Sequence, residues 1–168
     1  MPSRGAPKTV LGIDPGLAKI GWGVILVEGS ECQLIEYGHL ATSTDSCHAD
    51  RLLAIHREIV GVIDTHQPDV MVVEEIFHGR NPRSSLMTGE GRAACILAGA
   101  RRGLQVVEIP NTIVKLAVTG NGRASKQQVQ GMVRRLLDLS EDPRPSDAGD
   151  ALAIALTHAR RGQTKLRI

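Results

Sequence analysis

The stretch "TVLGIDPGLAKIGWGVILVEGSECQLIEYGHLA" at residues 9–41 decides the first half of the fold. An apolar run over 8–14 ends at the turn-forming tripeptide "DPG", and a second run over 20–29 follows at once. The tetrapeptide "EGSE" then separates this run from a third over 32–41. Connections this short leave no room for a crossover helix, so we expect three strands in an antiparallel meander.

Helical spacing follows the meander. Between 50 and 66, apolar residues recur three and four positions apart, which is typical of a helix with one buried face (Leu52, Ile55, Ile59 and Val62). The run "DVMVVEE" at 69–75 is short and continuously apolar, as in a strand at the centre of a sheet. A helix and then a buried strand are therefore expected here.

Helix and strand signals alternate over the rest of the sequence. We expect the segment 85–103, rich in small residues, to be a helix and "LQVVEIP" at 104–110 to be a strand. Asn111 can cap a short helix, and Ser125 with Gln128 matches the capping box that opens another. A last helix carries the apolar run near the C-terminus.

This order of segments predicts the α/β fold class, with a mixed sheet flanked by helices. The length of 168 residues lies in the range of a single domain. Apolar residues make up 42% and charged residues 23%, as in ordinary globular proteins. We therefore expect one domain over 1–168, with a core over about 8–160 and short flexible tails.

Cysteine usage and hydropathy indicate the compartment. Cys32, Cys47 and Cys95 are an odd number with no close pair, which argues against a disulfide framework or a zinc site and fits a reducing environment. The sequence also shows no apolar core of a signal peptide and no run near the roughly 20 residues of a membrane span. A soluble cytoplasmic protein without a membrane partner is expected.

Charge is distributed unevenly along the sequence. Residues 1–78 carry 5 basic and 11 acidic side chains, a net charge of −6. Residues 79–168 carry 15 basic and 7 acidic side chains, a net charge of +8. This asymmetry indicates a polyanionic partner on one face, although solvated helix surfaces explain it equally well.

Four acidic residues are candidates for the functional site, which in an α/β fold commonly lies beyond the ends of the strands. Asp14 and Glu74 end two predicted strands, and side chains beyond strand ends leave the core while a rigid frame holds them. Asp147 and Asp150 are three residues apart in the first turn of the last helix and share one face. Glu75 follows Glu74 and points to the opposite face of the sheet, so we exclude it.

Each acid alone also fits a structural role. "DPG" is a common turn, Glu74 can mark where its strand reaches solvent, and the helix dipole favours aspartate in a first turn. Together, however, the four carboxylates would repel one another unless a cation lay among them. All-oxygen ligands suit Mg²⁺ or Mn²⁺, and two such ions can clamp the attacking water and the leaving oxygen of a phosphodiester.

Four motifs carry a resemblance to a known family. "GIDPGLAKIGWGV", "VVEEIF", "VKLAVTGNGRASKQQVQGMVRRLL" and "DAGDALAIALTHA", in this order and spacing, resemble the RuvC family of crossover-junction endodeoxyribonucleases. The resemblance covers about residues 9–160. It implies a ribonuclease H-like fold, a homodimer, and hydrolysis of four-way (Holliday) DNA junctions by paired nicks. It also implies two Mg²⁺ ions per site, replaceable by Mn²⁺, and a branch-migration motor of the RuvA and RuvB type as partner.

The resemblance assigns the same four acids as catalytic metal ligands, namely Asp14, Glu74, Asp147 and Asp150. It implies that Lys115 and Lys126 engage DNA phosphate and that Phe77 stacks on bases. Phe77 is the only phenylalanine of the sequence and opens a polar, basic stretch, where an aromatic can stack on an unpaired base or tuck into the core. Arg80 and Arg83 in this stretch are candidate phosphate contacts, although surface arginines are common.

Two positions depart from the family pattern. Gly149 lies between the paired aspartates where alanine is usual, which lowers helix propensity by up to about 1 kcal/mol but keeps the spacing. Glu90 stands where glutamine is often found, and it adds negative charge near the helix that faces DNA. No acid of the set is missing.

Two other classes of function compete with the nuclease. "DPGLAKIGWG" also resembles the phosphate-binding hairpin of actin-like ATPases, but that class needs a second phosphate loop and an adenosine loop, for which 168 residues leave no length. A junction-binding module without activity predicts that at least one acid is replaced.

Paired nicks in a twofold-symmetric junction favour a twofold dimer of the enzyme. We expect the small-residue helix 86–100 to pack across the dyad of this dimer.

Overall fold

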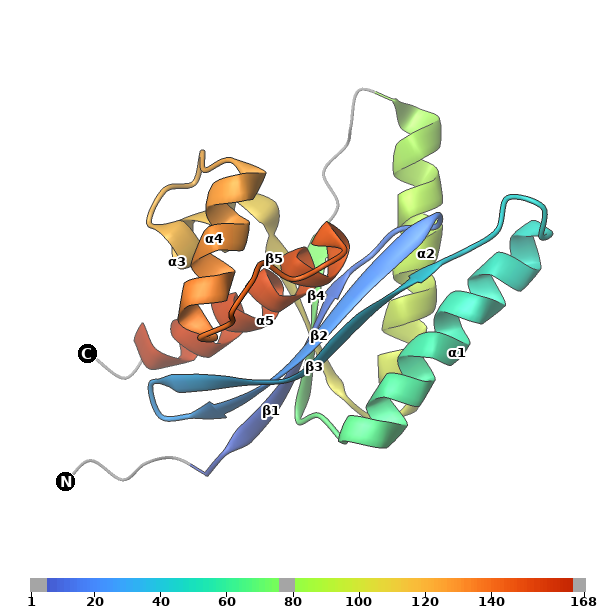
Figure 1. The fold of residues 1–168 in the computed structure, drawn as a ribbon. Coiled ribbons are helices and arrows are strands. Elements are labelled where there is room, and N and C mark those ends of the chain that lie inside the picture. Colours follow the sequence, from blue (N-terminus) through green and yellow to red (C-terminus); the bar gives the residue numbers. More distant parts are fainter. Residues whose placement is uncertain (1–5, 76–80, 165–168) are drawn as a thin grey trace.

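The protein is described by a computed structural model over residues 6–75 and 81–164, so Phe77 and Arg80 lie outside the described residues. Figure 1 shows the fold. Within these ranges the elements are β1 (Lys8–Asp14), β2 (Lys19–Glu28), β3 (Glu31–Ala41), α1 (His48–His66), β4 (Val70–Glu75), α2 (Pro82–Arg101), β5 (Gln105–Pro110), α3 (Asn111–Thr119), α4 (Lys126–Leu136) and α5 (Ser146–Thr164).

The strands form one five-stranded mixed sheet in the order β3–β2–β1–β4–β5. β1 pairs antiparallel with β2, and β2 pairs antiparallel with β3, so the predicted meander is confirmed. β4 and β5 add to the other edge of β1 in parallel. The predicted strand boundaries agree with the observed ones to within a residue because turn-forming residues or a proline flank each apolar run.

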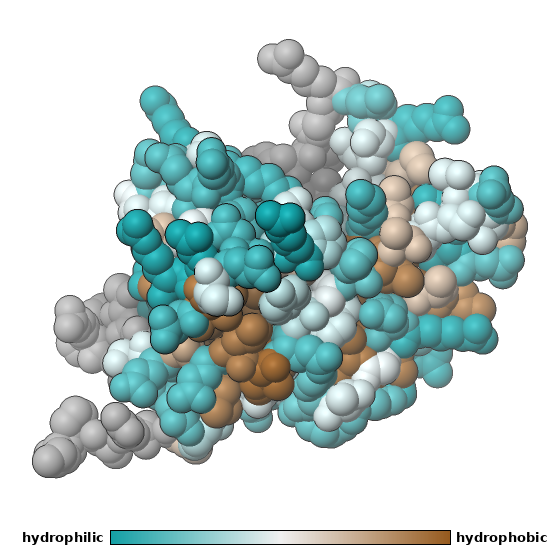
Figure 2. Space-filling model, viewed as in Figure 1, coloured by the Kyte–Doolittle hydropathy of each residue, from teal (hydrophilic) through white to brown (hydrophobic). Residues whose placement is uncertain are grey.

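Helices cover both faces of the sheet. α1 and α2 lie on one face, and α3, α4 and α5 lie on the other (Figure 1). A hydrophobic cluster fills the space on each side. Figure 2 shows a largely hydrophilic face, on which hydrophobic residues gather between the β2–β3 hairpin and the helices near it and again over α1 and α2. No helix among the described residues is long and apolar enough to cross a membrane.

Strand alternation places the functional side chains. Successive side chains of a strand point to opposite faces, and Val10 on β1 and Val70 and Val72 on β4 belong to the cluster beneath α5. Asp14 and Glu74 share the parity of these valines and therefore face α5. Because Ile13 pairs with Val73 in the parallel register, Asp14 and Glu74 come next to each other at the ends of adjacent strands.

Glycines bring α5 into contact with the backbone of the sheet. We call Gly12 on β1 and Gly21 and Gly23 on β2 the glycine patch. A β-carbon on Gly12 would lie 2.1 Å from the carbonyl oxygen of Ala151, and one on Gly21 would lie 2.1 Å from that of Asp147. Any larger residue would therefore push the helix off the sheet. The patch fixes the height of the first turn of α5 over the end of β1.

The C-terminal helix is buried almost all round. Ala148 and Ala151 to Leu156 are at most 2% exposed, since α5 is enclosed between the sheet and the pair α3 and α4. A helix that is apolar on every side belongs in a protein interior. Alanines on the sheet side keep the approach close, and leucine and isoleucine fill the remaining space.

The two predicted helix caps have different outcomes. The capping box of Ser125 and Gln128 is confirmed, with both reciprocal hydrogen bonds present. The prediction that Asn111 caps α3 was wrong, because Pro110 occupies the cap position and the cap has no side-chain hydrogen bond. Proline favours the extended backbone that precedes a helix, which shifts Asn111 into the first turn and frees its side chain.

We predict that Gly12→Ala destabilises the fold by about 2–3 kcal/mol or more, because the added methyl meets the backbone of α5 rather than a movable side chain. Urea denaturation measures the loss. Gly61→Ala on α1 is the control, since a β-carbon added there would point into open space and alanine favours helix by up to about 1 kcal/mol. Equal stability of the two variants would contradict the role of the glycine patch.

Candidate active site

The four predicted acids come from three elements that meet at one end of the sheet. Asp14 ends β1, and Glu74 lies one residue before the end of β4. Asp147 lies in the first turn of α5, and Asp150 follows three residues later. All four are partly buried. Asp14 pairs with Gly21, the glycine on which the Asp147 carbonyl rests, so the helix pair lies directly over the strand end.

Electrostatics show how near these acids are to one another. Burial raises the pKa of the Asp14 carboxyl, and the negative charges of Glu74, Asp150 and Asp147 raise that pKa further, to about 8. The ammonium of Lys126 acts in the opposite direction. The pKa of Asp14 therefore reflects first its burial at the strand end and then the charges of three carboxylates near enough to influence it.

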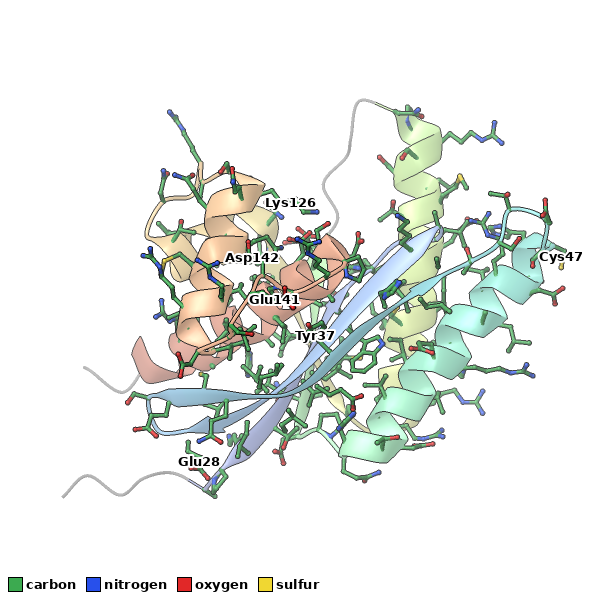
Figure 3. All side chains as sticks on the ribbon, viewed as in Figure 1. Glu28, Tyr37, Cys47, Lys126, Glu141 and Asp142 are labelled. Atoms are coloured by element: carbon green, nitrogen blue, oxygen red, sulfur yellow. The ribbon has the colours of Figure 1, made fainter. Side chains whose placement is uncertain are left out.

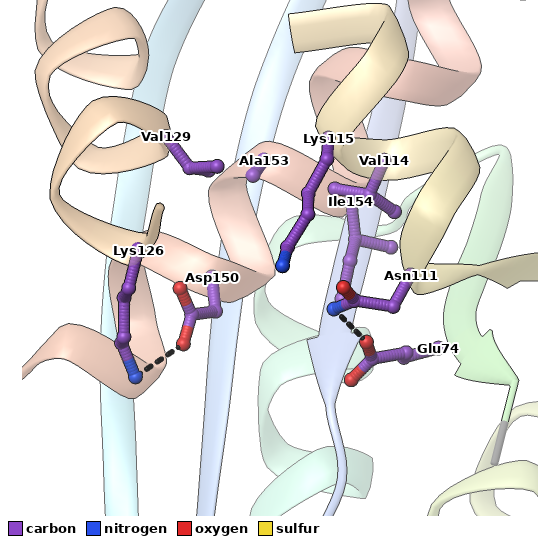
Figure 4. Close-up of a pocket in the computed structure, with 9 residues that line it drawn as sticks. All are labelled: Glu74, Asn111, Val114, Lys115, Lys126, Val129, Asp150, Ala153 and Ile154. Atoms are coloured by element: carbon purple, nitrogen blue, oxygen red, sulfur yellow. Dashed lines mark hydrogen bonds and ion pairs between the residues drawn. The ribbon is translucent and has the colours of Figure 1, made fainter. Parts of the chain in front are cut away.

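Neighbouring residues hold Glu74 in place from both faces of the sheet. The side-chain amide of Asn111, in the first turn of α3, donates a hydrogen bond to the Glu74 carboxylate (Figure 4). On the other face, Arg92 of α2 donates from Nε to the main-chain carbonyl of Glu74 at 3.0 Å and forms an ion pair with Glu108. Sequence reasoning missed both contacts, since neither Asn111 nor Arg92 lies near Glu74 in sequence.

Two residues of α4 bind the two oxygens of Asp150. Lys126 Nζ lies 2.7 Å from Oδ2, and Gln130 Nε2 donates to Oδ1 at 2.8 Å. Figure 3 shows Lys126 near the start of α4. Burial disfavours the charged ammonium of Lys126, but the hydrogen bond to Asp150 and the nearby aspartate charges outweigh it and raise the lysine pKa. A cation therefore already neutralises part of the acidic cluster.

A pocket of about 260 Å³ opens beside these acids. Figure 4 shows it with Glu74 on one side and Asp150 on the other, and with Lys115 reaching in from α3. Both predicted phosphate-binding lysines thus line one cavity. Apolar side chains complete its wall (Val114, Val129, Ala153 and Ile154). The pocket combines carboxylates, which attract cations, with ammonium groups, which attract phosphate.

The donor set fits a hard divalent cation. The acids supply only oxygen ligands, as Mg²⁺ and Mn²⁺ prefer, and a cation among them would relieve the repulsion that raises the pKa of Asp14. Within residues 6–75 and 81–164, however, no three acidic, histidine or cysteine side chains are already arranged to hold an ion. Asp150 and Glu74 instead hydrogen-bond to Lys126, Gln130 and Asn111.

Two further positions singled out in the sequence, Arg83 and Glu90, lie on α2. Arg83 is exposed in the first turn of α2. Asn81 caps this helix, because its side chain accepts hydrogen bonds from the backbone N–H groups of Arg83 and Ser84. Glu90, the second departure from the family pattern, lies 3.2 Å from Nε2 of His48 on α1. This contact joins the start of α1 to the middle of α2.

The sheet order and the acid positions define a class of protein. A mixed five-stranded sheet with an antiparallel meander, acids at the ends of its central strands and an acidic helix start across them is a ribonuclease H-like fold.

Comparisons with known proteins define the family. The family model of crossover junction endodeoxyribonuclease RuvC matches residues 10–158. The RuvC of Salinispora arenicola is 45% identical over 160 residues, 95% of this chain and 91% of that protein. The RuvC of Chloroflexus aggregans is 44% identical over 157 residues, 94% of this chain and 96% of that protein. T. thermophilus RuvC in complex with Holliday junction substrate superposes with a TM-score of 0.89 at 36% identity, over 94% of this chain and 96% of that chain.

The chain therefore belongs to the RuvC family of crossover junction endodeoxyribonucleases. The resemblance carried by the four motifs is confirmed, as is the ribonuclease H-like fold that it implied.

We predict that Asp14→Asn stabilises the metal-free protein at alkaline pH. Between the ordinary pKa of 3.8 and the raised value of about 8, folded Asp14 keeps a proton that the unfolded chain releases. Raising the pH through this window therefore lowers the free energy of unfolding. The variant lacks this loss and should gain roughly 1–3 kcal/mol on the wild type by pH 8.

Denaturation from pH 5 to 9 in a chelator measures this difference. Added Mg²⁺ should then stabilise the wild type more than the variant at pH 8, because only the wild type carries the Asp14 charge. Parallel stability curves across the pH range would contradict the clustering of the acids.

Proposed function

We propose that this protein is a Mg²⁺-dependent endonuclease that resolves four-way DNA junctions by paired, symmetric nicks. The observation that carries this proposal is the concentration of Asp14, Glu74, Asp147 and Asp150 at one strand end, beside a pocket lined by two lysines. The similarity to T. thermophilus RuvC, whose structure contains a Holliday junction substrate, supports the choice of DNA.

The four acids would hold the divalent ions, two per site, with Mn²⁺ as a substitute. When bound, Mg²⁺ supplies Lewis acidity for hydrolysis of a phosphodiester. The chain contributes a rigid frame, since Asp14 and Glu74 sit on adjacent strands and the glycine patch sets the position of Asp147 and Asp150. Asn111 keeps the Glu74 carboxylate turned toward the pocket.

Lys115 and Lys126 would receive the DNA phosphate. Both line the pocket, so their ammonium groups can offset the phosphate charge next to the acids. Without a cation, Lys126 pairs with Asp150. A divalent cation bound by the acids would replace Lys126 at Asp150 and leave the lysine ammonium available to phosphate. We assign Phe77, Arg80 and Arg83 to the junction-facing side, because Phe77 and Arg80 lie in the sequence between Glu74 and α2 and Arg83 is exposed in the first turn of α2.

A four-way junction has twofold symmetry, so paired nicks need two matched sites. We propose a homodimer that uses the outer face of α2. This face carries an exposed apolar seam of Leu86, Ala93, Leu97 and Ala100. Leu86 is 64% exposed and Leu97 is 52% exposed, and exposed apolar residues that share one helix face can mark an interaction site.

We further propose one nuclease domain over 1–168, action in the cytoplasm, and cooperation with a branch-migration motor of the RuvA and RuvB type. The family membership supports the last two assignments.

We predict that Asp14→Asn binds a synthetic four-way junction but nicks it at least about 10³-fold more slowly, because a carboxylate that holds the metal is lost. The wild type should cut in Mg²⁺ or Mn²⁺ and not in chelator, and binding should weaken steeply with salt. Denaturing gels follow cleavage, and mobility shifts in chelator follow binding. Equal cleavage by both proteins, or none by either in the two metals, would overturn the proposed function.

We predict that Leu97→Lys makes the protein monomeric without unfolding it, because two lysines would face each other across the dyad. Light scattering during gel filtration reports the mass, and the variant should lose paired cuts while single nicks persist. Ile35→Lys on β3 is the control, since Ile35 is also an exposed apolar residue but lies on another element. A monomeric wild type, or a variant that stays dimeric, contradicts the α2 interface.

A further inference from the structure

Gln130 is a buried polar side chain that none of the predicted roles explains. It lies one helical turn after Lys126 on α4 and is only 7% exposed. Its side-chain nitrogen donates to Asp150 Oδ1 at 2.8 Å and to the main-chain carbonyl of Ser146 at 3.2 Å. Both acceptors lie within the first five residues of α5, so the two hydrogens of the amide anchor α4 to the acidic end of that helix.

These two acceptors determine how the amide is turned. Because the Asp150 carboxylate and the Ser146 carbonyl can only accept, the nitrogen of Gln130 must face them. The oxygen then points the other way, where it is buried and has no hydrogen-bond partner within the described part of the chain. Leaving a buried oxygen unpaired is costly, so the arrangement indicates that the two donated hydrogen bonds matter more than the lost one.

Gly149 makes room for this amide. A β-carbon at Gly149 would lie 1.9 Å from Oε1, 2.6 Å from Cδ and 2.7 Å from Nε2 of Gln130. The whole amide group therefore occupies the volume of an alanine methyl. Gly149 is the position at which the sequence departs from the alanine that is usual between the paired aspartates. Glycine at position 149 lowers helix propensity relative to alanine, and the space that the missing methyl leaves is occupied by the Gln130 amide.

We propose that Gln130 is a positioning residue for Asp150, and that Gly149 permits this role. The proposal rests on the proposed function, since it concerns the metal affinity of the same acids. Lys126 and a divalent cation compete for Asp150 because both are positive. Gln130 is neutral and approaches the other oxygen, so it can stay in place when a cation binds and keep the carboxylate turned toward the pocket.

The test compares Mn²⁺ affinity across matched variants. Gln130→Leu keeps a side chain of similar bulk but removes the donor, and Gly149→Ala displaces the amide without altering it. Outer contacts of this kind change metal affinity by about 10–100-fold, so we expect both variants to bind Mn²⁺ at least about tenfold more weakly. Electron paramagnetic resonance of free Mn²⁺ measures the dissociation constant without DNA or catalysis. Gln127→Leu, an exposed neighbour on α4, is the control.

A double variant tests whether the two positions act through one contact. If they do, Gln130→Leu combined with Gly149→Ala binds Mn²⁺ no more weakly than Gln130→Leu alone, whereas independent effects would multiply. Nicking should recover toward the wild-type rate at saturating metal, because positioning alters affinity rather than the ligand set. Circular dichroism confirms that each variant is folded, and Gly149→Ala remains informative if Gln130→Leu is not.

Unchanged Mn²⁺ dissociation constants in both single variants would overturn the proposal. So would a loss of affinity as large in Gln127→Leu. A wild type that binds Mn²⁺ but never nicks a junction would overturn the proposed function alone. A wild type that binds no Mn²⁺ would overturn both.

Discussion

The contact between the backbone of α5 and the glycine patch is the constraint on which the rest of the structure depends. The carbonyl oxygens of Asp147 and Ala151 occupy space that any side chain on Gly21 or Gly12 would fill. The helix therefore rests on the strands themselves rather than on a layer of side chains. This closeness brings the first turn of α5 level with the end of β1, and it makes a site out of acids that are more than a hundred residues apart in sequence.

The fold places these acids together against their mutual repulsion. Extensive apolar packing around α5 supplies the stability that the acidic cluster takes away, as shown by the complete burial of Leu152 and the raised pKa of Asp14. Two of the carboxylates also accept a hydrogen bond from a neighbouring helix. Asn111 of α3 donates to Glu74, and Gln130 of α4 donates to Asp150. These two donors fix the Glu74 and Asp150 carboxylates in the cation-free protein, and Lys126 must release Asp150 when a cation binds.

Much of this architecture follows from local patterns. Short turns predict the meander, helical spacing predicts α1, and Ser125 with Gln128 predicts the start of α4. The error at Asn111 shows the limit, because a residue that suits a helix cap hydrogen-bonds instead to Glu74 on a strand. Gln130 and Arg92 escaped notice for a related reason. Sequence shows that each lies on a helix but not which strand or helix its side chain meets.

The sequence by itself determined the elements, the α/β class and the family, and it singled out the four candidate acids, since each of these depends on spacing along the chain. The tertiary structure alone decided which side chains hold those acids and why Gly149 is tolerated between two of them. Hydrogen bonds and close approaches depend on distances in space between residues 16 to 37 positions apart, such as Gln130 with Ser146 and Asn111 with Glu74. Only the packing of α5 on the glycine patch, and of α3 and α4 on α5, sets those distances.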